Sequence, residues 1–427
     1  MRSRQSILSV LLLLFTNVFA DPPNLARRGP SSGGSLALYW GQNPGPSQGY
    51  KSEGSLASYC QDSTVDIIII SFLNGWRRKS DGSYQMAMNL AVHTGDGKSC
   101  NGGALLSNGL PKCPGLEADI KTCQAKGKKV LIALGGSIPD GINYGLASDA
   151  DGKAFATAFN QVFLGDKSKP NLRPFGTAVL DGLDLDIEQG SSKGYAAFTL
   201  AIKKLSPSTI VAAAPQCPIP DRYLQDAMVR GRVEYIFMQF YNNPGCAAVS
   251  GGYNYKDWAN LVRTKFGYRS AKLFVGLPSS PGDAPAVTLH LHFHPTYSDP
   301  PTTPALRITH CLQGGYANIA QIKHIIDITR SGNSDVFGGI AFWEASTAFL
   351  NKQSDGQGIA QGTKKYLSKG STGKATPRCT KIYVTKSGDK CSKISKKKKV
   401  SKQNLAKWNP RIDCIKSLPT GHTICLR

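Results

Sequence analysis

Three acidic residues near the middle of the chain alternate with aliphatic residues. Asp184, Asp186 and Glu188 occupy every second position, and leucine or isoleucine fills the positions between them. Because successive side chains of a β-strand point to opposite faces, a strand here directs all three carboxyls to one side and the aliphatic side chains to the other. The pattern therefore predicts an acidic wall on one face of a strand whose other face is buried.

The spacing of these acids suits proton transfer. Side chains two residues apart on a strand are about 7 Å apart, so neighbouring carboxyls interact. Like charges in a confined site cannot all be ionised, which raises at least one pKa and leaves a shared proton. We therefore expect Glu188, at the outer end, to act as a general acid, with Asp186 and Asp184 passing a proton beneath it.

Two other interpretations of this segment are a metal site and a solvated acidic loop. A metal ion would require histidine or additional oxygen ligands in convergent positions. A solvated loop would not alternate acids with Leu183, Leu185 and Ile187. Asp181 has the opposite parity to the three acids, so we assign it a structural role.

The acidic segment ends the fourth of eight short, β-rich apolar runs, and stretches with helical spacing separate many of these runs. Repeated strand and helix units predict a parallel sheet, and eight units predict a closed (β/α)8 TIM barrel, an α/β fold. The chemistry of such barrels lies at the carboxyl ends of the strands. The runs cover residues 36–40, 65–73, 130–134, 177–187, 210–214, 233–241, 272–276 and 338–343. The helical stretches include residues 116–126, 155–163, 195–205 and 319–328.

The sequence around these acids resembles a known enzyme family. Residues 181–188 match the Asp-x-x-Asp-x-Asp-x-Glu signature of family 18 glycoside hydrolases, and their surroundings resemble the fungal and plant class III (hevamine-like) chitinases. With this segment, the matching stretches fall on seven of the eight expected strands. The others are Leu-Tyr-Trp-Gly-Gln-Asn at 38–43, Leu-Gly-Gly-Ser at 134–137, Ala-Pro-Gln at 214–216, Met-Gln-Phe-Tyr-Asn at 238–242, Phe-Val-Gly-Leu-Pro at 274–278 and Gly-Gly-Ile-Ala-Phe-Trp at 338–343.

The resemblance implies a substrate-assisted mechanism, which departs from the usual pair of catalytic carboxylates. Glu188 would protonate the glycosidic oxygen, and the 2-acetamido carbonyl of the sugar would attack the anomeric carbon. Asp186 would orient that acetamido group above Asp184, and Tyr241 would donate a hydrogen bond to its oxygen. No cofactor or metal ion is expected. The resemblance also implies that substrate is bound by Gln239, Trp343, Tyr39, Gln42 and Asn242.

Eleven cysteines in an exported chain are best explained as disulfide partners. The resemblance implies three disulfides in the barrel, which join Cys60 to Cys123, Cys100 to Cys113 and Cys217 to Cys246. Four cysteines near the carboxyl terminus would pair among themselves in one of three connectivities, which the sequence leaves open. These four are Cys379, Cys391, Cys414 and Cys425.

Residues 378–427 resemble a LysM domain of the fungal type, which folds as a small βααβ unit. The matching residues include Ile-Tyr-Val at 382–384, Gly-Asp at 388–389 and Trp-Asn-Pro at 408–410. A disulfide-stapled basic unit without a ligand is the alternative interpretation. The resemblance implies that N-acetylglucosamine oligomers bind between two loops, formed by Gly388, Asp389 and Lys390 and by Asn409, Pro410, Arg411 and Ile412.

The amino-terminal residues predict export. Residues 1–20 place Arg2 and Arg4 before an apolar run and are interpreted as a signal peptide, and residues 21–34 as a loose leader. The run is too short to span a membrane, so we expect a secreted protein, extracellular or in the cell wall. The remaining boundaries are a barrel at 35–367, a small polar linker at 368–377 and the LysM domain at 378–427.

The chain is strongly basic. It has 51 Lys and Arg residues against 28 Asp and Glu residues, a net charge of +23, and more than half of this excess lies in residues 371–427. Such a segment can indicate nuclear import or nucleic-acid binding. Because a secretory signal argues against both, a solvated or wall-binding basic face is the better interpretation.

Together these features predict a monomeric, endo-acting chitinase that hydrolyses β-1,4 linkages by a retaining, substrate-assisted mechanism, with the LysM domain attaching it to chitin. Its partners would be chitin and N-acetylglucosamine oligomers, and neither nucleic acid nor a membrane. A lectin-like chitin-binding protein is one alternative, although such proteins usually lose the terminal acid of the signature, here Glu188. An endo-β-N-acetylglucosaminidase acting on glycoproteins is the other.

Residues 287–313 do not fit the resemblance, because the family runs from the turn at 277–282 almost directly into a Gly-Tyr loop, here at 314–316. Three alternating histidines, His290, His292 and His294, offer a metal site as one interpretation. The stretch also contains Cys311, which is left without a disulfide partner, and it lacks a helix or strand pattern. Valine codons begin with GT, one glutamine codon is CAG, and 27 codons keep the reading frame. We therefore hypothesise a retained intron, with a real surface loop as the alternative.

Overall fold

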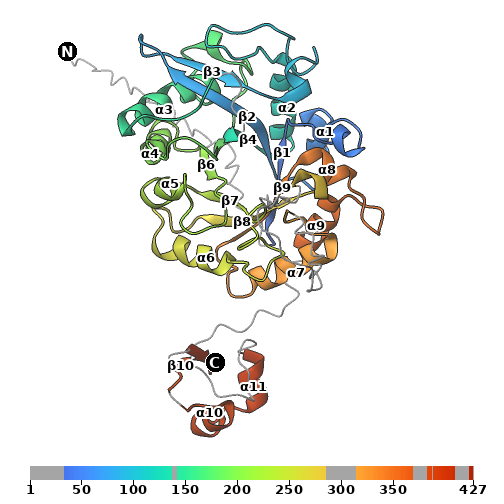
Figure 1. Ribbon diagram of the computed structural model, residues 1–427, viewed down its shortest axis with the longest axis vertical. Coiled ribbons are helices and arrows are strands. Elements are labelled where there is room, and N and C mark those ends of the chain that lie inside the picture. Colours follow the sequence, from blue (N-terminus) through green and yellow to red (C-terminus); the bar gives the residue numbers. More distant parts are fainter. Residues whose placement is uncertain are drawn as a thin grey trace, which may run out of the picture.

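A computed structural model of the chain describes residues 33–136, 142–284, 314–368, 382–386, 388–408 and 423–426. Its larger part is a closed barrel of eight parallel strands, because β1 pairs with both β2 and β9 and the other strands pair in sequence between them (Figure 1). The prediction of a (β/α)8 barrel is therefore confirmed. The barrel strands are β1 (Ser35–Trp40), β2 (Ile67–Arg78), β4 (Lys129–Gly136), β5 (Gly182–Ile187), β6 (Ile210–Ala213), β7 (Tyr235–Gln239), β8 (Lys272–Pro278) and β9 (Phe337–Trp343).

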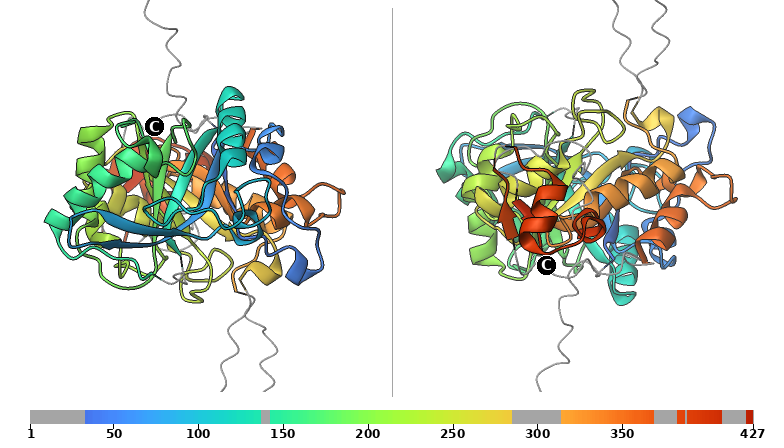
Figure 2. Two further views of the ribbon diagram at one scale, coloured as in Figure 1. Left: turned by 90° about the horizontal axis from the view of Figure 1, so that it is seen from above. Right: turned by 90° about the horizontal axis from the view of Figure 1, so that it is seen from below.

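Helices surround the barrel (Figures 1 and 2). The four expected helical stretches correspond to α2, α3, α4 and α7, and α4 has the predicted bounds. The helices are α1 (Leu56–Cys60), α2 (Pro114–Ala125), α3 (Asp149–Phe163), α4 (Tyr195–Leu205), α5 (Gln225–Arg230), α6 (Tyr255–Thr264), α7 (Ile319–Arg330), α8 (Ala345–Leu350) and α9 (Ile359–Ser368). Short 3-10 turns are η1 (Pro46–Gln48), η2 (Ala91–Thr94), η3 (Pro170–Leu172) and η4 (Pro281–Asp283).

The barrel strands alternate between an inner and an outer layer of buried side chains. Ala37 and Tyr39 of β1 belong to the cluster inside the barrel, whereas Leu36, Leu38 and Trp40 belong to the layer shared with the helices. Alanines, larger aliphatic side chains and aromatic rings together fill the interior. A polar residue at an inner position near the carboxyl end of a strand therefore projects toward the mouth of the barrel.

The strand expected at 177–187 is shorter than predicted, since β5 begins at Gly182. Asp181, directly before it, accepts hydrogen bonds from the Val130 amide (3.0 Å) and from Gln124 Nε2 (2.9 Å) and forms an ion pair with Lys129 (2.8 Å). These contacts fix the start of β5 to its neighbours, which is the structural role expected for Asp181.

One feature of the sheet was not predicted from the sequence. β2 continues to Arg78, beyond the expected end at residue 73, and forms an antiparallel hairpin with β3 (Tyr84–Met88). The apolar run gives no sign of this extension, because the residues after Leu73 include Asn74, Gly75 and two arginines. The hairpin places Asn74 at the carboxyl-terminal side of the barrel, where it lines the cavity described below.

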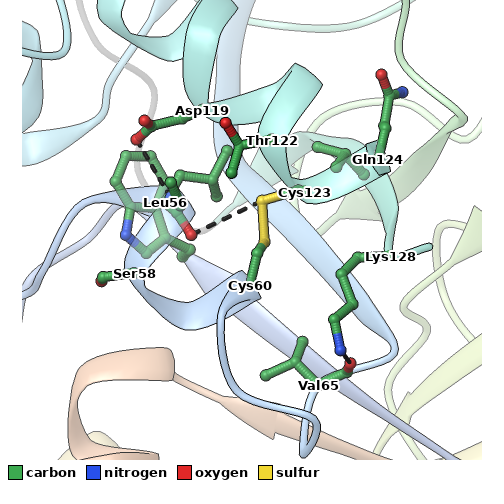
Figure 3. Close-up of a disulfide and its surroundings, with 12 residues drawn as sticks. Leu56, Ser58, Cys60, Val65, Asp119, Thr122, Cys123, Gln124 and Lys128 are labelled. Carbon is green, nitrogen blue, oxygen red and sulfur yellow. Dashed lines mark hydrogen bonds between the residues drawn. A yellow bond between two sulfur atoms is a disulfide. The ribbon is translucent and has the colours of Figure 1, made fainter. Parts of the chain in front are cut away.

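Three disulfides cross-link the described part of the barrel, and they are the pairs that the resemblance implies: Cys60–Cys123, Cys100–Cys113 and Cys217–Cys246. The first joins α1 to α2 (Figure 3). Beside it, Lys128 Nζ donates a hydrogen bond to the Val65 carbonyl at 2.6 Å (Figure 3). Because these residues precede β4 and β2, the contact ties together the amino-terminal ends of two strands, opposite the mouth of the barrel.

The carboxyl-terminal residues form the predicted βααβ unit. β10 (Ile382–Val384) pairs antiparallel with β11 (Thr423–Cys425), and α10 (Cys391–Lys398) and α11 (Lys402–Trp408) lie between them in sequence. Tyr383, Cys391, Ile394 and Leu405 form its small core. Cys391 is disulfide-bonded, which supports a unit with so little apolar surface to bury.

Several predicted features lie outside the described residues: the signal peptide and most of the leader at 1–32, the stretch at 287–313, the linker residues 369–377 and the second LysM loop at 409–412. Within the described residues, no helix has both the length and the apolar character needed to cross a membrane.

Candidate active site

The acidic segment lies at the carboxyl end of β5. Asp184 and Asp186 project into the barrel and are buried, whereas Leu183 and Leu185 face the helices, as the alternation predicts. Glu188 directly follows the last residue of β5 and is partly exposed. The segment thus carries its acids from the closed interior of the barrel to its open mouth.

Gln239, the last residue of β7, connects the two outer acids. Its Nε2 donates to Asp186 Oδ1 and to Glu188 Oε1, each at 2.9 Å, and also lies 3.1 Å from the Ala214 carbonyl. One amide group from β7, which only β6 separates from β5, therefore holds both carboxyls in a fixed relation. Gln239 lies among the five residues to which the resemblance assigns substrate binding, and its geometry gives it a positioning role as well.

Asp184 lies at the bottom of this row and is shielded from solvent. It is fully buried, and Tyr39 Oη donates to its Oδ2 at 2.8 Å. Its other oxygen, Oδ1, has no hydrogen-bond partner among the described residues. Burial raises the pKa of Asp184 to about 7, and the Tyr39 hydrogen bond only partly offsets this effect.

The other two acids also hold their protons more tightly than in water. Burial raises the pKa of Asp186 well above its usual value, and the negative charges of Glu188 and Asp184 add to this effect. Burial likewise raises the pKa of Glu188, assisted by Asp221, whereas the bond from Gln239 opposes the rise in both residues. A proton shared within the row is therefore the expected state.

Tyr144 fixes the backbone at the catalytic end of β5. Its hydroxyl donates to the Gly136 carbonyl at 2.6 Å and accepts a hydrogen bond from the Glu188 amide at 3.2 Å. The Trp76 ring stacks on it, with centroids 5.2 Å apart. Tyr144 thus joins the ends of β4 and β5 and holds the Glu188 main chain in place.

Aromatic rings form the floor and one wall of the site. Trp343, at the end of β9, stacks on Phe72 with centroids 5.6 Å apart and meets the edge of Tyr39 at 5.8 Å. Tyr241 follows β7 and shares a lining with Trp343. Burial raises the pKa of Tyr241 well above its usual value, and the charges of Asp186 and Glu188 add to this effect. Its hydroxyl therefore keeps its proton at neutral pH and remains a hydrogen-bond donor.

The acids and rings surround a cavity of about 400 Å³ at the mouth of the barrel. Its size and its mixture of polar groups with aromatic surface suit a ring-shaped polar ligand such as a sugar. It contains most of the residues that the resemblance selected, with Asp184 and Tyr39 directly beneath. The lining residues are Gln42, Phe72, Asn74, Asn89, Gly136, Asp186, Glu188, Gln216, Gln239, Tyr241, Asn242, Asp283 and Trp343.

Two predicted substrate-binding residues also hold the walls of the cavity. Gln42 Nε2 donates to the carbonyls of Ser71 (2.8 Å) and Asn89 (3.1 Å), so its side-chain amide joins the end of β1 to β2 and to the residue that follows β3. The main-chain amide of Asn242 donates to the Gly314 carbonyl at 2.9 Å. Both residues remain candidates for contact with substrate through the atoms that face the cavity.

Of the predicted LysM loops, only Gly388, Asp389 and Lys390 are described. Gly388 and Lys390 are exposed, but Asp389 is buried and accepts hydrogen bonds from Tyr383 Oη (2.7 Å) and the Lys386 amide (2.9 Å). Its carboxylate therefore stabilises the turn. A contribution of Asp389 to ligand binding would come through the shape of this loop.

Sequence reasoning missed several residues that build the site. Asp221 accepts hydrogen bonds from the amides of Gln216 (2.9 Å) and Leu224 (2.6 Å), and it adds negative charge near Glu188. Tyr144 was also missed, because neither residue belongs to a regular run that marks a strand end. Among the described residues, no group of three His, Cys, Asp or Glu side chains is arranged to hold a metal ion.

Comparisons with known proteins give a consistent result. Residues 36–290 match the sequence profile of Glycosyl hydrolases family 18, and residues 383–427 match that of the LysM domain. Chitinase 1 of Rhizopus niveus is 35% identical over 321 residues, which are 75% of this chain and 56% of that protein. The Endochitinase of Saccharomyces cerevisiae is 33% identical over 346 residues, which are 80% of this chain and 51% of that protein. This chain therefore spans about half the length of these curated relatives.

Among solved structures, the ICChI chitinase from Ipomoea carnea is similar to this chain, with a TM-score of 0.57 and 28% sequence identity. The match covers 78% of this chain and 100% of that one.

Proposed function

Because the chain belongs to family 18 of the glycosyl hydrolases, we propose that it is an endo-acting chitinase, which cleaves β-1,4 linkages between N-acetylglucosamine units. The relatives with the names chitinase and endochitinase support this substrate. The observation that carries the proposal is the bridge from Gln239 to Asp186 and Glu188, at the edge of a cavity with Trp343 in its wall.

Glu188 is the general acid of the proposed reaction. It is the outermost acid and the only one of the three that is partly exposed, so a glycosidic oxygen can reach it. Its raised pKa keeps a larger fraction protonated near neutral pH than for an ordinary glutamate. Protonation of the leaving oxygen breaks the bond from the anomeric carbon to that oxygen.

The nucleophile is the carbonyl oxygen of the sugar's own 2-acetamido group. Asp186 lies beside Glu188 on the same wall and orients the acetamido nitrogen, and Tyr241 donates a hydrogen bond to its carbonyl oxygen. Trp343 supports the distorted sugar from the apolar side. Water then opens the resulting oxazolinium ion, with Glu188 as the base, so that two displacements return the anomeric carbon to its original configuration.

The LysM domain has a separate role in the proposal. It attaches the enzyme to chitin and so raises the concentration of the barrel at an insoluble surface. We also propose that the protein is monomeric and secreted to the cell wall or the medium.

The decisive experiment is incubation of the purified protein with colloidal chitin and, in parallel, with fully deacetylated chitosan. Soluble oligomers are expected from chitin alone, because chitosan lacks the acetamido nucleophile. NMR spectra taken before mutarotation should show the β anomer. Predominantly α products would contradict the retaining mechanism, and binding of chitin without release of oligomers would indicate a sequestering protein.

A further inference from the structure

A second group of buried ionisable residues lies next to the cavity and takes no part in the proposed reaction. Glu53, His93 and Glu344 are only 6%, 4% and 0% exposed. None of them lines the cavity. Charged side chains are seldom buried so completely unless each has a partner, so the contacts of this group require an explanation.

One oxygen of each carboxyl is fully engaged. Glu53 Oε2 accepts a hydrogen bond from the Gly41 amide at 3.0 Å and lies in hydrogen-bond contact with His93 Nε2 at 3.1 Å. Glu344 Oε1 accepts from the Thr347 amide at 3.0 Å and from the Ser346 hydroxyl. These bonds anchor Glu53 to the end of β1 and Glu344 to the start of α8.

The second oxygen of each carboxyl lacks a hydrogen-bond donor among the described residues. Glu53 Oε1 and Glu344 Oε2 are buried, and no N–H or hydroxyl group of the described residues donates to either. The two side chains instead form a hydrogen bond with each other. Since an ionised carboxylate has no hydrogen to donate, this contact requires one proton between the two groups.

The position of the pair links it to the walls of the cavity. Glu344 directly follows Trp343 in sequence, and Glu53 holds Gly41, which directly precedes Gln42. His93 lies in η2, close to Asn89, and stacks on Trp40 of β1 with centroids 4.4 Å apart. The shared hydrogen bond therefore connects the ends of β1 and β9, which carry two residues of the proposed sugar site.

We propose that Glu53 and Glu344 are positioning residues that share one proton and, through it, hold the Gln42 and Trp343 walls of the cavity together. When this proton is lost, two adjacent anions remain in a buried place and repel each other. The pair therefore keeps the walls together in acid and neutral solution and weakens them as the solution becomes alkaline.

The electrostatics of the pair agree with this role. Burial raises the pKa of Glu53 to about 7, and burial together with the charge of Glu53 raises the pKa of Glu344 well above its usual value. His93 offers little compensating charge, because burial lowers its pKa. Among the described residues, ionisable groups that face the pair or His93 from neighbouring elements include Tyr59, Asp96 and Asp119.

The sign of the pH dependence follows from the raised pKa values of Glu53 and Glu344. The folded chain binds the shared proton more tightly than the unfolded chain, in which both glutamates have ordinary pKa values. The pair's contribution to the free energy of unfolding is therefore complete below about pH 4.5 and is lost as the pH rises through the folded pKa values. One extra bound proton changes the unfolding equilibrium constant by about tenfold per pH unit.

Glu344→Gln tests the shared proton, because the amide donates to Glu53 without taking up a proton. Denaturant unfolding of the full chain should be measured between pH 5 and pH 9 for this variant and for the wild type. Between about pH 5 and pH 7, the unfolding equilibrium constant of the wild type is expected to rise relative to that of the variant by up to about tenfold per pH unit. The variant thus gains stability relative to the wild type as the pH rises. A difference that does not change with pH would overturn the proposal, because it would indicate ordinary packing.

Two further variants complete this experiment. Glu53→Gln places the amide on the other side of the contact, so the same relative gain is expected and the test survives if one variant folds poorly. Asp355→Asn changes an exposed carboxyl and serves as the matched control, with the wild-type pH profile expected.

A second measurement addresses the cavity walls and rests on the proposed function. For a soluble chitin oligomer, the wild-type KM should rise relative to that of Glu344→Gln above pH 7, with a smaller change in the ratio of kcat values. Equal KM profiles would overturn the positioning role. A wild-type protein without hydrolase activity would contradict the proposed function alone, since the unfolding measurements need no substrate.

Discussion

Ala133 of β4 lies directly opposite Asp184 of β5 in the parallel pairing of the two strands, and both side chains face the barrel interior. A methyl group thus lies beside a buried carboxyl whose Oδ1 has no hydrogen-bond partner in the described part of the chain. On the other side of Asp184, the register places Ala212 of β6. This apolar flanking explains why burial dominates the pKa of Asp184, which is about 7.

Ala133→Ser is expected to give Asp184 the missing donor. A hydrogen bond to the charged form should lower the pKa of Asp184 by about 1 to 2 units. The raised pKa makes the free energy of unfolding fall as the pH rises from about 4 to about 7, so the variant should lose less stability over this range. Carbon-13 NMR titration of the carboxyl measures the shift, with Ala212→Ser as a second donor position. Ala37→Ser, also inside the barrel but not paired with Asp184, should leave the titration unchanged.

Glu188→Gln should abolish hydrolysis while leaving the fold and oligomer binding intact. The isosteric amide cannot deliver a proton, and loss of general acid catalysis lowers the rate by about 10² to 10⁴-fold. Release of soluble oligomers from colloidal chitin measures activity, and titration calorimetry with a chitin oligomer measures binding. Retention of wild-type activity would show that another group supplies the proton.

Gln239→Leu removes the amide that joins Asp186 to Glu188. The hydrogen bonds from Gln239 lower both carboxyl pKa values, so their loss should move the acid limb of the kcat/KM profile to higher pH by about 1 unit. Activity should fall about 10- to 100-fold. Gln216→Leu is the matched control, because Gln216 lines the same cavity but bonds to Asn243; its acid limb should not move.

Removal of residues 370–427 should separate catalysis from attachment. Cleavage of short soluble oligomers should remain close to the wild-type rate, because the cavity is built entirely from barrel residues. Retention on insoluble chitin should decrease in a sedimentation assay, since the LysM domain no longer holds the enzyme at the surface. An equal loss on both substrates would argue against an independent binding domain.

Mass spectrometry of the secreted protein should detect a peptide in which Ala286 is joined directly to Gly314. The structure supports this prediction, because Gly314 lies against Ala284: a methyl group on its Cα would be 2.2 Å from the Ala284 carbonyl oxygen. A direct join would leave Pro285 and Ala286 as the central pair of a four-residue turn, with proline at its favoured second position. Detection of any peptide from within 287–313 would exclude the retained intron.

The sequence by itself determined the barrel and the acidic wall. The period of two in residues 183–188 set which side chains enter the barrel, because side-chain alternation is a local property of a strand. The repeated strand and helix runs likewise predicted the (β/α)8 architecture. The three barrel disulfides followed from the resemblance, since a family's cysteine positions transfer by alignment.

Contacts between distant strands were decided only by the tertiary structure. Gln239 reaches Asp186 and Glu188 across more than 50 positions, and Tyr39 reaches Asp184 across 145. The Glu53–Glu344 pair is still further apart in sequence, and neither glutamate lies in a recognisable motif. Periodicity reports which face a residue occupies, but the closure of the barrel decides which residues meet. For that reason the pKa values of the buried acids, which depend on these contacts and on the exclusion of water, could not be predicted from the sequence.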